Sequence, residues 1–152
     1  MFIVTERFNL LNKMYKETDI IYEAVANLEA HTGLNISVET GRREYDAIIQ
    51  LDGQTLCVEA KANARKSNIG MILSQLEMQD KNKKWLFVAD YLAKDVAEIL
   101  QKESHNYLDV AGNAFIKTNN LFIFIEGKKK RSKDKKNQSR AFQEVGLKLL
   151  LL

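Results

Sequence analysis

Three charged residues are spaced in a way that suits metal-dependent phosphoryl chemistry: Asp46, Glu59 and Lys61. Two carboxylates held side by side repel each other, and a hard divalent cation with oxygen ligands relieves that repulsion. Such an ion polarises a phosphate and orients an attacking water, while a nearby lysine positions or deprotonates the water or stabilises transition-state charge. We therefore expect Asp46 and Glu59 to bind Mg²⁺ or Mn²⁺ and Lys61 to assist hydrolysis.

A β-hairpin would bring these residues together. The dipeptide Asp52-Gly53 is a strong hairpin signal, and a two-residue loop there pairs the residues on either side of it. The same register sets Asp46 directly opposite Glu59, in a non-hydrogen-bonded pair with Cβ atoms about 4.5–5.5 Å apart. Lys61 shares that face because it lies two residues beyond Glu59. The other face would be apolar, carrying Tyr45, Ala47, Ile49, Leu51, Leu56, Val58 and Ala60.

An alternative interpretation gives the hairpin no catalytic role. The hairpin could be a surface element in which Glu44 and Lys61 form a cross-strand ion pair and Asp46 lies at an exposed edge. Against it, Glu59 and Lys61 follow an apolar run of residues 56–58, so they stand at the end of an otherwise buried strand.

The elements around the hairpin predict a single α/β domain, as expected for 152 residues. A helical segment, in one or two pieces, is predicted over residues 6–31 because apolar residues recur there at helical spacing. Strands are predicted over 35–40, 45–51, 54–60 and 84–89, helices over 67–80 and 93–103, and a last hairpin over 113–118 and 121–126. This order predicts a mixed sheet with helices on its faces. Trp85 and Phe87 are interpreted as core residues of the fourth strand.

The composition favours a cytoplasmic protein. The chain has one cysteine, and its first residues lack the charged and apolar regions of a signal peptide. No apolar run approaches the roughly 18 residues of a membrane span, so we expect no membrane association.

The segment from Asp46 through twelve residues to Glu59-Ala60-Lys61 resembles the motif of the PD-(D/E)XK nuclease superfamily, with Tyr45 where the motif has proline. The resemblance implies a restriction-endonuclease-like three-layer core, a central mixed sheet flanked by helices, and metal-dependent hydrolysis of DNA phosphodiester bonds. It places the metal on Asp46 and Glu59 and an assisting role on Lys61. Gln75 matches a functional glutamine of some branches, and Glu23 is the best match for a metal-binding glutamate on the first helix of others.

Residues 106–126 are similar to a segment of AbiEi-like antitoxins of type IV toxin–antitoxin systems and related winged-helix regulators. This implies a nuclease-like domain over residues 1–127, a basic linker over 128–140, and over 141–152 a C-terminal helix that begins a winged-helix domain. The Leu-rich end is also a candidate homodimer contact. Asp109 and Asn113 either border the site or form the turn before the last hairpin.

Basic residues are concentrated in one place. Residues 128–140 hold eight Lys or Arg and one acid, so this segment carries +7 and the rest of the chain −4, for a total of +3. The segment has no aromatic residue, so it is suited to phosphate contact without base reading, or else is a solvated linker. The predicted DNA contacts are Arg42, Arg43, Arg65, Lys66, Lys128, Lys129, Lys130 and Arg131.

Three functions remain open on the sequence alone. The first is a DNA endonuclease that uses Mg²⁺ or Mn²⁺. The second is a catalytically silent DNA-binding regulator or antitoxin that keeps the nuclease fold. The third is a dimerisation module that uses the Leu-rich end.

Overall fold

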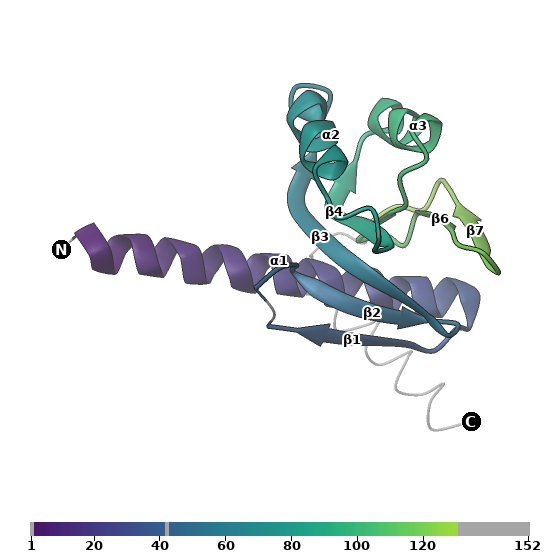
Figure 1. The fold of residues 1–152 in the computed structure, drawn as a ribbon, viewed down its shortest axis with the longest axis horizontal. Helices are drawn as coiled ribbons and strands as arrows, with labels where there is room; N and C mark the ends of the chain where they lie inside the picture. The colour runs from purple at the N-terminus through teal and green to yellow at the C-terminus, as the bar shows by residue number, and fades with distance from the viewer. Residues whose placement is uncertain (1, 42, 131–152) are drawn as a thin grey trace.

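A computed structural model describes residues 2–41 and 43–130 as an α/β fold, in which a seven-stranded mixed sheet carries helices on both faces (Figure 1). The predicted DNA contacts Arg42 and Arg131, most of the predicted linker, and the predicted helix over 141–152 lie outside the described residues. None of the helices within the described ranges has the length and apolar character that crossing a membrane requires.

The strands lie in the sheet in the order in which they occur along the chain. Strands β3, β4 and β5 run parallel to one another, and the remaining neighbours are antiparallel. The elements are α1 (Phe2–Thr32), β1 (Ile36–Thr40), β2 (Ala47–Leu51), β3 (Gln54–Ala64), α2 (Ile69–Glu77), β4 (Trp85–Leu92), α3 (Lys94–Lys102), β5 (Tyr107–Asp109), β6 (Ala114–Lys117) and β7 (Phe122–Ile125).

Helix α1 covers one face of the sheet, and its N-terminal part extends beyond the sheet edge (Figure 1). Its apolar stripe, which includes Ile21 and Leu28, packs against inward-facing strand residues such as Ile49, Val58 and Leu108. These side chains are at most 1% exposed, because strand alternation sends every second residue of β2 and β3 toward α1. This cluster is the larger of the two cores.

Helices α2 and α3 lie on the opposite face (Figure 1). They are short helices with two buried residues each, and they pack on Phe87 of β4 and Tyr107 of β5. Each connects two parallel strands, β3 to β4 through α2 and β4 to β5 through α3, as parallel neighbours require. The prediction of a mixed sheet with helices on its faces is confirmed.

The predicted hairpin register is confirmed where the two strands pair. Leu51 is paired with Gln54 and Ala47 with Val58. Asp52 and Gly53 both have positive φ, 49° and 74°, which is the conformation of a type I′ turn.

Several predicted boundaries are wrong. The first helix is one continuous element from Phe2, because no glycine or proline interrupts it. Strand β2 begins at residue 47 instead of 45, and β3 and β4 run longer than predicted. Strand β5 was not predicted. It has three residues, which are too few to show an alternation of apolar and polar side chains, and its last residue, Asp109, is of a type common in turns.

Candidate active site

Strand β3 directs Glu59 and Lys61 to the face that carries α2 and α3. Its even-numbered residues 56, 58, 60 and 62 pack in the α1 core, so alternation sends the residues between them to the other face. Glu59 is aligned with Phe87 of β4 and Lys61 with Ala89, and both charged side chains are half-buried. The prediction that Glu59 and Lys61 share a face is confirmed.

Gln75 reaches the same side from α2. It lines, together with Glu59, a hollow of about 420 Å³ between α2 and the start of β3 and β4. Tyr45, Lys83 and Trp85 also line this space, which we call the Glu59 hollow. The structure therefore brings two of the four predicted catalytic residues together, whereas Asp46 and Lys61 do not line this space.

Asp46 has a different surrounding from the one predicted. Its backbone N–H donates to the carbonyl of Val58 over 2.9 Å, and its carboxylate Oδ2 accepts the N–H of Ala60 over 2.7 Å. In the predicted register the N–H of Ala60 would instead pair with the backbone of residue 45, so the ladder stops at Ala47 and a side chain replaces the missing acceptor. One carboxylate oxygen of Asp46 is thus used by the backbone.

The end of the ladder also corrects the placement of Tyr45. The prediction put this ring on the apolar α1 face, but it lies against Trp85, with ring centroids 6.2 Å apart and planes at 74°. Lys83 is 5.0 Å from the Tyr45 ring centroid. Because alternation is lost at Asp46, residue 45 turns to the side of α2.

The Glu44–Lys61 ion pair of the alternative interpretation is not what the structure shows for Glu44. Glu44 is paired with Lys83, with Oε2 and Nζ 3.2 Å apart. This hydrogen bond raises the pKa of Lys83 above its ordinary value. Both side chains are open to solvent, so the pair belongs to the rim of the Glu59 hollow.

The residues fit a divalent ion only as a partial ligand set. Asp46 comes just before β2 and is not paired with Glu59, so the predicted face-to-face pair of acids is not formed in the ladder. Two carboxylates completed by substrate phosphate and water are nevertheless a common arrangement for Mg²⁺. Within the described ranges, no group of three or more His, Cys, Asp or Glu residues is placed to hold a metal. An ion bound here would therefore depend on the substrate for further ligands.

Glu23 does not join this site. It is exposed on α1, which packs on the face of the sheet opposite Glu59, and it does not line the Glu59 hollow. The resemblance to a first-helix metal ligand is not matched by its position.

Asp109 and Asn113 form a turn. Asp109 is only 4% exposed, and its two carboxylate oxygens accept the backbone N–H and the side-chain amide of Asn113, each over 2.9 Å. Burial raises the pKa of Asp109, and hydrogen bonds from residues 111–113 oppose that rise. Of the two interpretations offered by the sequence, the structure matches turn formation.

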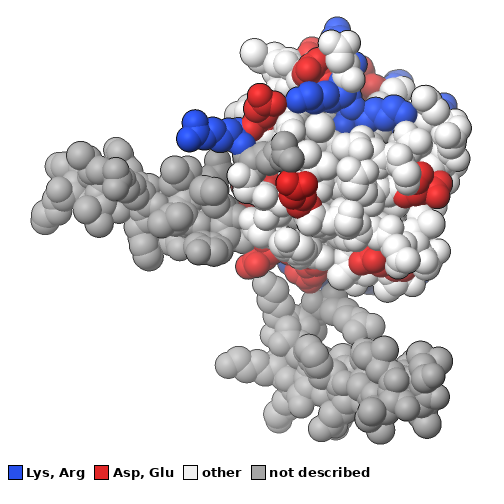
Figure 2. All heavy atoms as spheres, turned by 60° about the horizontal axis from the view of Figure 1, so that its bottom comes forward, with Lys and Arg blue, Asp and Glu red and all other residues white. Residues whose placement is uncertain are grey.

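The basic residues are exposed but partly tethered. Arg43, Arg65 and Lys66 are open to solvent. Lys128 exchanges two backbone hydrogen bonds with the Asn113 side chain, of 2.8 and 2.9 Å, and Lys130 forms an ion pair with Asp90. The first residues of the basic segment are therefore held against the fold. On the face drawn in Figure 2, Lys and Arg gather along one edge, while the acids are scattered.

Two aromatic residues of the site were missed from the sequence. Trp85 was interpreted as core, yet it is half-buried and lines the Glu59 hollow beside Tyr45. The available signal was its position as the first residue of β4 directly after two lysines, where a strand emerges from solvent.

Comparison with known proteins gives no match to a family model, a curated protein or a solved structure. The functional argument therefore depends on the geometry of the chain itself.

Proposed function

We propose that this chain carries a PD-(D/E)XK-type nuclease domain with a restriction-endonuclease-like core, which hydrolyses DNA phosphodiester bonds with Mg²⁺ or Mn²⁺. The main support is that Glu59 of β3 and Gln75 of α2 line one hollow. The order of helix, three-stranded meander, helix and parallel strand is also the order that the sequence resemblance implies.

In this proposal each residue has a separate task. Asp46, through the oxygen that the backbone does not use, and Glu59 hold the ion. The bound ion would supply charge neutralisation at the phosphate and an oriented water. Lys61, on the same face of β3 as Glu59, positions that water or stabilises developing charge, and Gln75 orients the substrate from the α2 side.

Two observations favour a second candidate, a catalytically silent DNA-binding module of the regulator or antitoxin kind. The Asp46 carboxylate already bonds the Ala60 N–H, which gives it a structural reason to be present. The described residues also lack a complete set of three metal-ligating side chains. A scaffold that kept the fold without the reaction would look the same in these two respects.

Calorimetric titration with Mn²⁺ separates the candidates when it is done on variants that remove only the charge of each carboxylate. Asp46→Asn keeps an oxygen acceptor for the Ala60 N–H but removes the charge, and Glu59→Gln does the same on β3. We expect both to lose metal affinity by more than the roughly 10–100-fold that removing an outer-shell partner costs, and to lose plasmid cleavage. Glu98→Gln, an exposed acid of α3, is the matched control and should leave both unchanged.

The opposite results are equally informative. Undiminished DNA binding without any metal effect would favour the silent module. If wild type shows neither metal binding nor DNA binding, both candidates are wrong.

A further inference from the structure

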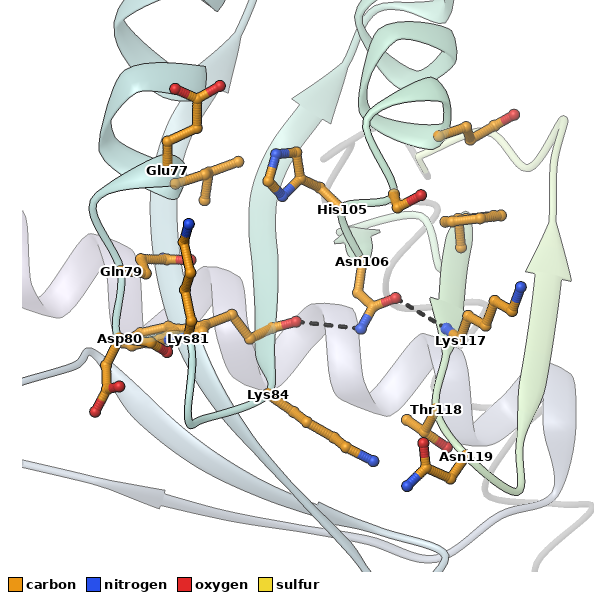
Figure 3. A pocket seen from close by; sticks show the side chains of 15 residues that line it. Glu77, Gln79, Asp80, Lys81, Lys84, His105, Asn106, Lys117, Thr118 and Asn119 are labelled. Carbon is orange, nitrogen blue, oxygen red and sulfur yellow. Dashed lines mark hydrogen bonds between the residues drawn. The ribbon is translucent and has the colours of Figure 1, made fainter.

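A large groove lies between the end of α2, the end of α3 and strand β6 (Figure 3). It has a volume of about 1080 Å³, and we call it the α2–α3 groove. It shares Gln79, Asp80 and Trp85 with the Glu59 hollow, so the two spaces adjoin at these residues. A chain molecule lying in the groove would thus pass beside the Glu59 hollow.

Lysines stand on both walls of this groove. Lys81 and Lys84 come from the α2–β4 loop, and Lys117 comes from β6 on the other side (Figure 3). Lys84 points to the side of Thr118 and Asn119 in Figure 3, and its Nζ donates to Gln54 Oε1 over 3.1 Å, which leaves two of its three N–H groups for other acceptors. Cations on facing walls suit a backbone of repeated phosphates.

The two acids of the groove do not cancel this charge. Asp80 accepts the N–H of Asn82 over 3.0 Å, and its side chain points away from the Lys117 wall (Figure 3). Its carbonyl accepts the Trp85 indole N–H over 2.9 Å, so Asp80 shapes its own loop. Glu77 is exposed at the end of α2. Three lysines against two acids leave the lining positive.

The floor of the groove is fixed and rich in amides. Asn106 donates to the carbonyl of Trp85 over 3.3 Å and accepts the N–H of Lys117 over 2.9 Å, which joins β4 to β6 just before β5 begins (Figure 3). Gln79 Nε2 and Thr118 Oγ1 are closed to solvent and have no hydrogen-bond partner among the described residues, so they belong to the packing under the floor. The amide that the groove exposes to a ligand is that of Asn119, which suits the polar edge of a base.

Aromatic rings continue the groove across the sheet. Trp85 and Phe115 line it, and Phe122 and Phe124 of β7 pack edge-on to Phe115, with ring centroids 5.9 and 6.1 Å away. Phe122 is 62% exposed and Phe124 is 44% exposed. Exposed rings beside lysines are the usual platform for unpaired bases.

We propose that the α2–α3 groove binds single-stranded nucleic acid, with phosphates on Lys81, Lys84 and Lys117 and bases on Trp85, Phe115 and the β7 rings. The proposal rests on the proposed nuclease function in one respect: the groove would guide a strand to Glu59. Binding of the strand itself does not depend on catalysis. A duplex is disfavoured because its stacked bases hide the surfaces that the rings and amides contact.

Trp85 is the only tryptophan of the chain, so its fluorescence reports on this groove directly. Wild type is titrated in EDTA with a thymidine oligonucleotide, a uridine oligonucleotide and a DNA duplex of equal length, each also followed by anisotropy of an end label. We expect saturable quenching by the single strands and at least about tenfold weaker binding of the duplex. Tight binding of either single strand supports the groove, and their ratio gives the contribution of the sugar 2′-hydroxyl.

Variants locate the binding. Lys81→Gln with Lys117→Gln, which removes one lysine from each wall, should weaken binding and lower the salt slope by up to about 1.4, at roughly 0.7 for each phosphate contact. Lys16→Gln with Lys94→Gln carries the same charge change on exposed lysines outside the groove and should have little effect. Phe122→Ala should weaken binding about tenfold without changing the Trp85 environment.

Three results would overturn the proposal: duplex binding as tight as single-strand binding, binding by anisotropy without Trp85 quenching, or equal losses in the two lysine pairs. The Glu59→Gln variant keeps this test separate from the nuclease. If Glu59→Gln still shows quenching and wild type cleaves no DNA, the nuclease proposal alone is wrong. If wild type cleaves DNA but shows no quenching, the groove proposal alone is wrong.

Discussion

The face of the sheet under α1 and the face under α2 and α3 are built for different purposes. The α1 face is a continuous apolar core, in which the part of α1 from Ile20 to Leu28 packs across strands from both halves of the sheet. The other face has a smaller core, held by two helices of nine residues each. Glu59, Lys61 and Gln75, the Glu59 hollow and the α2–α3 groove lie on that second side.

Polar groups are distributed in the same unequal way. Asp109 is the buried charged residue of the described structure, and alternation along β5 places it with Tyr107, away from the α1 core. A sheet with one fully apolar face has the stability to accept half-buried charges such as Glu59 and Lys61 on the other. We therefore expect stability to depend mainly on the first face and chemistry on the second.

The largest expected effect is on the α1 face. Leu28→Ala removes a side chain that is 1% exposed and leaves a cavity, so we expect the free energy of unfolding to fall by about 3 kcal/mol. Leu73→Ala, at a half-buried position of α2, is the matched control and should lose less than half as much. Urea denaturation measures both, and equal losses would show that the two faces contribute alike.

Asp109→Asn should come second, with a loss of about 2 kcal/mol in urea denaturation at neutral pH. The new side-chain amide would turn a donor toward the Asn113 amide or backbone N–H, both of which now donate to the carboxylate. Asn113→Ala should cost less, since it leaves a carboxylate that other turn N–H groups still contact. If Asp109→Asn leaves the free energy of unfolding unchanged, this turn does not contribute to the stability of the second face.

The same residue predicts a pH dependence. Because burial raises its pKa in the folded state, folded Asp109 retains its proton at pH values where the unfolded chain has released it. The folded state then binds more protons, so stability falls as pH rises from the ordinary carboxyl pKa to the raised one. Urea denaturation across this range should show the advantage of wild type over Asp109→Asn becoming smaller as pH rises, and parallel curves would contradict the raised pKa.

The smallest effect is expected at the rim of the Glu59 hollow. Lys83→Ala removes the ion pair with Glu44, whose side chains are 37% and 76% exposed, so we expect only a small fall in the free energy of unfolding, below those of the other variants. The difference should vanish at roughly 1 M salt, where the Debye length is about 3 Å. A larger loss that persists in salt would indicate that the Lys83–Tyr45 contact helps to hold the second face together.

The fold was largely predictable where local signals set the geometry. The Asp52-Gly53 turn fixed the pairing of β2 with β3, and helical spacing of apolar residues found α1, α2 and α3. Strand β5 was missed because three residues carry no period, and its neighbours and direction depend on the whole sheet.

The candidate site was predictable only in part, for a related reason. The alternation of β3 gave the common face of Glu59 and Lys61. It could not give the end of the ladder at Ala47, which depends on the Asp46 carboxylate taking the Ala60 N–H and which turns Tyr45 toward Trp85. The Trp85 side of the Glu59 hollow likewise comes from packing between elements distant in sequence.

Strands β2 and β3 are joined by only two residues, whereas β3 and β4 are joined by a long connection that contains α2. Hairpins of this kind form in about 1–10 μs, and parallel pairing across a long connection is slower because more chain entropy is lost first. In a chain emerging from the ribosome, we expect the hairpin that carries Glu59 to form early and Gln75 of α2 to pack beside it late. Glu59 would then be in place on its strand before the α2 wall that limits access to it.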